Sequence, residues 1–424
     1  MKIALELMMF MMILQCLWHV IRTWIVNKKI KQNKINIAKF KQNKIKITKF
    51  YIVIPCLQEQ KTISKTIDYF TNFINSTEIN AELFIVTTNK EQLLTKQGKT
   101  TFEIVKEQIS TSDKYKFVHL LNYPKVEGMM ADQLNYSIDM INTMYTVDNR
   151  HDYFCVYNAD SRPGRDTFNQ AKIVASEKQF PLVMQEYSAF FSNLKSLSPI
   201  MRGFAGYQTN FELINGFTNA VLPSIFLRNH VVGHGLFIRF DYLTQIGGFN
   251  TYFWCEDICL SFYLRSQGIA IEPLFTLEYG ESPKKLKILA KQNANWFKTL
   301  SDNYKIYQVV SQNKKSKKFR TILYYLNQVR GAIAWLLLPS FYLTIFIVLI
   351  FLNIRLALFF VIVYFTTTFI RFWLSNFIVK SLHGKLPESN SLLAFESSIS
   401  YLISNIGPLY SEFHKKGTKY KTER

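Results

Sequence analysis

An adjacent pair of acids, Glu256-Asp257, opens an expected helix and is the arrangement in this sequence best suited to acid–base chemistry. A carboxylate within hydrogen-bond reach of a weakly acidic hydroxyl can take its proton. Gly247-Gly248 breaks the preceding element. The apolar residues after Asp257 recur at helical spacing but also alternate as in a strand, and we favour the helix because Gly268 is a typical helix stop. Because the helix dipole favours acids at a helix start, the pair also fits a plain N-terminal cap.

A second acidic position, Asp160 in the run Asn158-Ala159-Asp160, follows a short segment of β-forming residues. Open α/β sheets bind their ligands at the carboxyl ends of strands. The sequence therefore predicts a ligand site at the end of this strand.

Strand-like runs alternate with helical stretches from residue 51 to about residue 300. The runs are residues 51–55, 83–87, 116–121 and 153–157. Alternation at this spacing predicts a mostly parallel, doubly wound sheet with helices between the strands.

Four motifs resemble, in order, those of the inverting glycosyltransferases of family 2, which have the GT-A fold. They are residues 50–60 with Pro55 and Glu59 (first strand and nucleotide loop), Asn158-Ala159-Asp160 (the metal-binding DxD), Glu256-Asp257 (the catalytic ED pair) and residues 292–296, QNANW (the QxxRW box of membrane-embedded members). The closing residues 418–424 are also similar to the C-terminal end of many such enzymes.

The resemblance implies transfer of a sugar from a nucleoside diphosphate sugar, UDP-linked, to a glycan or lipid-linked acceptor with inversion. Asp257 would be the base, with Glu256 beside it. The donor would contact Pro55, Glu59, Asn158 and Asp160, with Asp160 also holding Mg²⁺ or Mn²⁺, which suit an all-oxygen site. The box resemblance adds Gln292 and Trp296 as acceptor contacts, although Trp is common at membrane interfaces without any such role.

His234 is a further candidate for acceptor binding. It stands between Gly233 and Gly235, where the backbone can approach a ligand closely. A turn histidine without a functional role remains the alternative.

The sequence departs from the family pattern at several positions. Asn158 takes the first DxD position, Asn295 replaces the Arg of the QxxRW box, and Thr87-Thr88-Asn89 stands where many members carry an Asp-rich loop. These departures leave open a catalytically inactive GT-A-like membrane subunit that binds a nucleotide sugar or a partner synthase.

The formal charge of +21 does not indicate a nucleic-acid partner, because the lysines and arginines lie beside apolar segments. Residues 28–49 hold nine lysines and no acid, and residues 311–330 are also basic without an acid. Such blocks report cytoplasmic sidedness and attraction to an anionic lipid bilayer.

We expect an α/β protein, a GT-A (Rossmann-like, mostly parallel sheet) domain with one N-terminal and two or three C-terminal membrane helices. The expected parts are a transmembrane anchor at 1–27, a basic linker with a decapeptide repeat at 28–50, the glycosyltransferase domain at 51–300, a basic interfacial segment at 301–330, a transmembrane helix pair at 331–379, and an amphipathic helix with a basic tail at 380–424. The third C-terminal candidate, residues 391–410, is expected to lie at the interface or pack on the other helices rather than span. The charge pattern predicts a multi-pass membrane protein with its catalytic domain in the cytoplasm.

Overall fold

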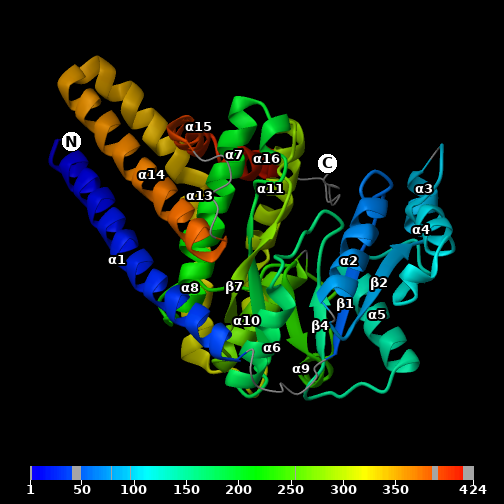
Figure 1. Cartoon of the computed structure of the whole chain (residues 1–424). Helices are drawn as coiled ribbons and strands as arrows, with labels where there is room; N and C mark the ends of the chain where they lie inside the picture. The colour runs from blue at the N-terminus through cyan, green and yellow to red at the C-terminus, as the bar shows by residue number, and fades with distance from the viewer. Residues whose placement is uncertain are drawn as a thin grey trace. The chain divides into compact units, whose positions relative to one another are not determined.

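The computed structural model describes residues 2–40, 49–77, 79–95, 97–253, 255–383 and 390–413 (Figure 1). The expected C-terminal motif at 418–424 and most of the second decapeptide lie outside these residues. The chain forms two compact units, each described here by itself. Unit 1 comprises Met1–Ile35, Ser188–Asn229 and Gly280–Arg424, and unit 2 comprises Asn36–Tyr187 and His230–Tyr279.

A seven-stranded mixed sheet in the order β3-β2-β1-β4-β6-β5-β7 lies at the centre of unit 2. It is parallel from β3 to β4, and β6 runs antiparallel to both β4 and β5. The strands are β1 (Phe50–Pro55), β2 (Ala81–Thr88), β3 (Val118–Tyr123), β4 (Tyr153–Val156), β5 (Val183–Ala189), β6 (Leu236–Arg239) and β7 (Glu272–Tyr279). The four strands expected from the sequence are confirmed as β1 to β4.

Alternate residues of β1 enter two different cores, one on each face of the sheet. Phe50, Ile52 and Ile54 pack on one face and Tyr51 and Val53 on the other, and all five are buried. Strands covered on both faces are nearly continuous apolar runs, which is why this segment was readable from the sequence.

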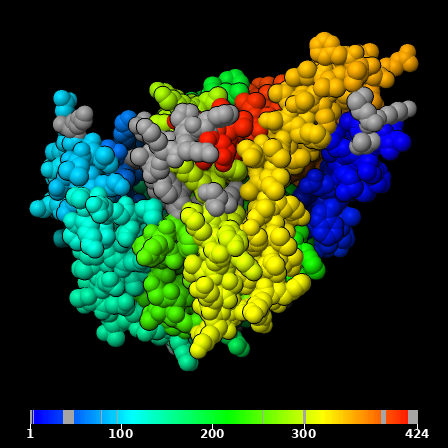
Figure 2. Space-filling model, turned by 180° about the vertical axis from the view of Figure 1, so that it is seen from behind, coloured from blue at the N-terminus to red at the C-terminus, as the bar shows by residue number. Residues whose placement is uncertain are grey.

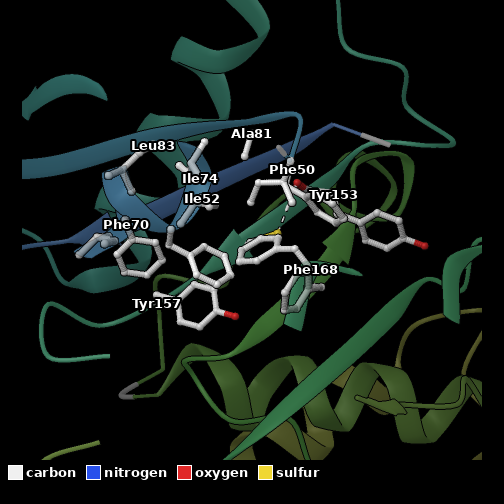
Figure 3. Packing of buried hydrophobic residues seen from close by; sticks show 14 of the residues in the cluster. Phe50, Ile52, Phe70, Ile74, Ala81, Leu83, Tyr153, Tyr157 and Phe168 are labelled. Atoms are coloured by element: carbon white, nitrogen blue, oxygen red, sulfur yellow. Dashed lines mark hydrogen bonds between the residues drawn. The ribbon is translucent and has the colours of Figure 1, made fainter. Parts of the chain in front are cut away.

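Helices cover both faces of this sheet. The core on the Phe50 face includes α2 (Ile63–Thr77), α4 (Thr101–Ile109) and α6 (Thr167–Glu177), and its aromatic rings meet edge to face, with the Phe50 and Phe168 centroids 5.0 Å apart (Figure 3). The opposite core includes α5 (Met130–Met144), α9 (Phe240–Ile246) and α10 (Glu256–Gln267). Unit 2 also holds α3 (Lys90–Leu94) and the short 3₁₀ helix η1 (Asp113–Tyr115).

The expected helix after the acid pair is confirmed as α10. It begins at Glu256 and ends where Gly268 takes a left-handed conformation with φ of 79°. Glycine adopts this conformation without the steric cost that other residues incur, so the residue terminates the helix.

The antiparallel direction of β6 determines where the candidate site forms. Leu236, the first residue of β6, pairs with Val156, the last residue of β4. The loop that enters β6 therefore lies at the same edge of the sheet as the turn that leaves β4. This places residues 233–235 beside residues 158–160.

Unit 1 is helical. Its elements are α1 (Lys2–Phe40), η2 (Leu194–Ser196), α7 (Pro199–Asn210), the π-helix η3 (Phe211–Phe217), α8 (Thr218–Val221), α11 (Leu286–Ser301), α12 (Asn303–Ser311), α13 (Lys318–Leu352), α14 (Ile354–His383), α15 (Ser391–Leu402) and α16 (Ile406–Phe413). Residues 188–229 and 280–300, which we expected within the sheet domain, cluster with these helices. The helix α1 continues through the first decapeptide, which contains neither Gly nor Pro to stop it.

Three helices of unit 1 are long and apolar enough to cross a membrane, which indicates a membrane protein. They span residues Leu5–Ile35, Lys318–Leu352 and Ile354–His383. The two views show α1, in blue, alongside α14, in orange (Figures 1 and 2). The helix α15 packs closely on α7, where the backbone of Glu396 approaches Gly203 and its carboxylate pairs with Arg202.

Candidate active site

The turn that leaves β4 is held by its own hydrogen bonds. The Ser161 amide donates to the Asn158 carbonyl, and the Asn158 amide donates to Ser161 Oγ, both at 3.0 Å. The Thr66 hydroxyl donates to the carbonyl of Ala159. Asp160 sits within this fixed turn and is 8% exposed.

Glu278, near the end of β7, joins this turn to the loop that contains His234. The Ser161 hydroxyl donates to Glu278 Oε1 at 2.6 Å, and His234 Nδ1 lies 2.9 Å from Glu278 Oε2. The Glu278 side chain is 2% exposed, so both contacts are shielded from water. A carboxylate at Nδ1 fixes the orientation of an imidazole ring and favours the tautomer that carries the proton on Nδ1.

Gly235 is required by the close packing of this loop. Its φ is 61°, and a Cβ there would lie 2.6 Å from the Glu186 carbonyl oxygen and 3.1 Å from Glu278 Oε2. Gln185 Nε2 donates to the His234 carbonyl at 2.8 Å, and Gln185 Oε1 accepts from the Val232 amide at 2.9 Å. The loop is therefore rigidly positioned by β5.

The same loop positions Asp257. The Gly233 amide donates to Asp257 Oδ2 at 3.1 Å, and the Ile258 amide donates to Asp257 Oδ1 at 2.7 Å. A continuous set of bonded residues thus runs from the Asp160 turn through Glu278 and His234 to Asp257. The structure brings these sequence candidates together in unit 2.

Asp257 has the electrostatics of a base near neutral pH. Burial and the adjacent Glu256 carboxylate, in that order, raise the pKa of Asp257 to about 7. The two backbone amides and His234 oppose this rise but do not cancel it. The residue as a whole is only half-buried.

Glu256 lines a small hollow next to Asp257. The hollow is bounded by the turn at Gly247-Gly248 and by the face of α10 that carries Cys259, Leu260 and Tyr263. Both carboxylates of the acid pair lie near Gly233, each 3.5 Å from where a Cβ on that glycine would stand. The arrangement combines an acid with apolar walls beside the candidate base.

A second buried carboxylate, Glu186 of β5, lies beneath the site. It accepts hydrogen bonds from the Tyr157 hydroxyl at 2.9 Å, the Gly164 amide at 3.2 Å and the Thr167 hydroxyl. Full burial and then the charge of Glu278 raise the pKa of Glu186 to about 7.

The loop after β1 contains two of the expected donor contacts. Pro55 ends the strand, and the Glu59 carboxylate accepts from the Thr62 hydroxyl at 3.1 Å. Between them, Gln58 has a φ of 55°, a left-handed conformation that is uncommon outside glycine and concentrates at ligand sites.

The Thr87-Thr88-Asn89 segment is hydrogen-bonded to the end of β3 and to the loop that follows it. The Thr87 hydroxyl contacts Asn122 Oδ1 at 2.9 Å, and Asn89 Nδ2 donates to the Pro124 carbonyl at 2.7 Å. These bonds give the segment a structural role.

The two remaining acceptor candidates belong to unit 1. On α11, Gln292 is 7% exposed and its Oε1 has no hydrogen-bond partner among the described residues. Trp296 is 41% exposed.

The turn at Asp160 fits a divalent cation that receives most of its ligands from a substrate. Among the described residues, no group of three or more His, Cys, Asp or Glu side chains could hold a metal alone. Mg²⁺ and similar ions commonly bind through one or two carboxylates, with phosphate oxygens and water completing the shell. A single carboxylate at a strand end, with oxygen-bearing neighbours, meets that requirement.

Sequence reasoning missed Glu278, Glu186, Ser161 and Gln185. One signal was available, because Glu186 is the only charged residue of β5 and Glu278 follows an uncharged run in β7. A buried carboxylate is costly unless it is hydrogen-bonded, so an acid inside such a strand indicates a polar network.

No family model matches this sequence, and no curated protein matches it. A solved structure of a mannosyltransferase from Pyrobaculum calidifontis, in complex with GDP-mannose and Mn²⁺, is 13% identical. The match covers 97% of this chain and all of that chain, with a TM-score of 0.48. The function of this protein therefore has to be argued from its own residues.

Proposed function

We propose that this protein is a membrane-associated inverting glycosyltransferase. It moves a sugar from a nucleoside diphosphate sugar, UDP-linked, to a hydroxyl of a glycan or lipid-linked acceptor at the cytoplasmic membrane face. The observation that carries this proposal is the bonded path from the Asp160 turn to Asp257, a carboxylate with a pKa raised to about 7.

Asp257 would act as the general base. Its carboxylate takes the proton of the acceptor hydroxyl while the hydroxyl oxygen forms a bond to the anomeric carbon. The bond from that carbon to the diphosphate oxygen breaks, and its electron pair leaves with the nucleoside diphosphate. A single displacement from the face opposite the leaving group inverts the anomeric configuration.

Glu256 and the hollow beside it would bind the acceptor. The hollow offers one carboxylate for a sugar hydroxyl and apolar side chains, Leu260 and Tyr263, for a ring face. His234, oriented by Glu278, would place a hydrogen-bonding nitrogen close to the same region.

Asp160, with Asn158 as a neutral oxygen donor, would hold Mg²⁺ or Mn²⁺ at the diphosphate. When bound, such an ion neutralises the negative charge that develops on the leaving group. Pro55 and Glu59 would contact the nucleotide from the end of β1.

The alternative is an inactive subunit that binds a nucleotide sugar or a partner synthase. It accounts for Asn158 and Asn295 but gives no reason for a carboxylate with a pKa near 7 beside an acid-lined hollow. Such a protein would bind nucleotide sugars without turning them over.

A donor screen distinguishes these two functions. Purified full-length protein is incubated with UDP- and GDP-linked sugars in Mg²⁺ or Mn²⁺, and release of nucleoside diphosphate is measured. We expect slow, metal-stimulated release from one donor, which EDTA abolishes. Binding of a donor without release from any of them would contradict the enzyme and support the inactive subunit.

A further inference from the structure

A group of polar side chains lies among the apolar helices of unit 1. Arg371 is in the middle of α14, and His19 and Arg22 are on α1. The two helices touch at this level, since Cys16 Sγ lies 4.0 Å from the Thr367 carbonyl oxygen. An ionisable residue at membrane depth is costly and indicates a functional group or a bound partner.

Within the described residues, neither the His19 ring nor Arg371 Nε has the hydrogen-bond partner that a buried polar group requires. His19 is 5% exposed, and neither ring nitrogen has a hydrogen-bond partner among the described residues. Arg371 Nε is buried and also has no partner in the described part of the chain. Buried polar groups are nearly always hydrogen-bonded, so both side chains point to a missing ligand.

Among the residues that the structure describes, no acid pairs with Arg371. Arg22 is occupied by Asn219 Oδ1 at 2.7 Å and the Thr218 carbonyl at 3.2 Å. The carboxylate of Glu396 on α15 pairs with Arg202. No ion pair is formed by Arg371 within the described residues.

The Arg371 guanidinium has tyrosines from four helices in its neighbourhood. It lies within electrostatic range of the hydroxyls of Tyr207 (α7), Tyr342 (α13), Tyr364 (α14) and Tyr401 (α15). Ring centroids in this group are 5.5 Å apart for Tyr207 and Tyr401 and 5.9 Å apart for Tyr342 and Tyr364. The Tyr364 hydroxyl donates its proton to the Ser398 carbonyl at 2.6 Å, so the hydroxyls that can donate to an anion beside the unpaired guanidinium are those of Tyr207, Tyr342 and Tyr401.

The surroundings indicate that this anion carries an apolar tail. On the same two helices, Trp18, Ile370 and Trp373 are 51%, 37% and 41% exposed. Tyr207, Tyr342 and Tyr401 are only partly buried, so the group is open at its edge. A phosphate attached to a lipid would place its charge at Arg371 and its chain along these exposed side chains.

We propose that Arg371, His19 and the hydroxyls of Tyr207, Tyr342 and Tyr401 form a binding site for the phosphate group of a membrane lipid. Arg binds phosphate through paired, charge-assisted hydrogen bonds, which are strongest where water is excluded. This site does not rest on the proposed transfer reaction, and its test needs no nucleotide sugar.

Binding of dodecyl phosphate to the purified full-length chain in neutral detergent tests the proposal, with dodecanol as the uncharged control. We expect wild type to bind dodecyl phosphate more tightly than dodecanol. Arg371→Gln should weaken dodecyl phosphate binding about tenfold or more, and Arg371→Lys should weaken it less. Arg355→Gln, the same change at the exposed start of α14, should leave binding unchanged.

The source of the phosphate is identified by competition. Dioctanoyl phosphatidylglycerol that displaces dodecyl phosphate efficiently points to a bilayer phospholipid, and poor displacement points to a lipid monophosphate. Either result supports the site. Equal affinity of wild type for dodecyl phosphate and dodecanol would overturn it, even if Arg371→Gln fails to fold, and so would unchanged binding by a folded Arg371→Gln protein.

Discussion

Burial and the neighbouring Glu256 carboxylate both raise the pKa of Asp257. Because a base works only when it has lost its proton, the rate of transfer should rise as pH increases through about 7 and level off above it. The plateau should begin at the upper side of neutrality, where Asp257 is fully ionised.

Glu256→Gln removes a negative charge next to Asp257 and should therefore lower the pKa of Asp257. We expect the ascending limb of the pH–rate profile to move to lower pH, together with weaker acceptor binding. The profile is measured from initial rates of sugar transfer at saturating donor. Glu177→Gln, which neutralises an exposed acid at the end of α6, is the matched control and should leave the limb in place. If the ascending limb of the pH–rate profile stays in place in Glu256→Gln, Asp257 is not the titrating group.

Asp160→Ala should abolish the stimulation of turnover by metal and weaken nucleotide binding, because its carboxylate is the main expected ligand in the turn after β4. Asn158→Asp supplies a second carboxylate and should tighten metal binding or leave it unchanged. Metal titrations of turnover, with nucleotide affinity measured by calorimetry, check both variants. Retained metal dependence in Asp160→Ala would show that the metal binds elsewhere.

At the scale of elements, the turn between α9 and α10 depends on Gly247 and Gly248. Both are left-handed, with φ of 75° and 81°, but a Cβ at Gly247 meets nothing within 4 Å, whereas one at Gly248 would lie 2.5 Å from Asn135 Oδ1. Asn135 holds the turn by two hydrogen bonds of 2.8 Å to the backbone of Phe249.

These neighbouring glycines form a matched pair for mutation. Gly247→Ala should cost about 1–2 kcal/mol through its backbone conformation alone. Gly248→Ala should have the same backbone cost. It should also disrupt the two hydrogen bonds between Asn135 and Phe249, which contribute about 1 kcal/mol each. Thermal unfolding midpoints should therefore fall further for Gly248→Ala. Equal midpoints would mean that Asn135 does not hold the turn.

The sequence predicted β1 to β4 and α10 because each is a regular pattern bounded by clear stop signals. It did not predict that β6 runs antiparallel beside β4, since the register depends on contacts distant in sequence. That pairing, together with Glu278, is what brings His234 to the Asp160 turn. The acid pair was recognisable by type, but the network that joins it to Asp160 was not.

At the scale of the whole molecule, three candidate spans and the basic blocks beside them favour a cytoplasmic catalytic domain. A cysteine introduced at Asn353, between α13 and α14, should react with a membrane-impermeant maleimide on intact cells. A cysteine at Lys314, before α13, should react only after lysis. The unmodified chain, with its five native cysteines, gives the background. Labelling of the Lys314 cysteine on intact cells would mean that the catalytic domain faces the outside of the cell.

The substitution Asp257→Asn tests whether Asp257 removes the acceptor proton. Transfer should fall about 10²-fold or more, while donor affinity and the thermal midpoint stay close to those of wild type. Asp241→Asn, which alters an acid in the first turn of α9, is the matched control and should retain its rate. A folded Asp257→Asn protein that transfers sugar at a near-normal rate would contradict the account, and a loss explained by a lower midpoint alone would assign Asp257 to helix capping.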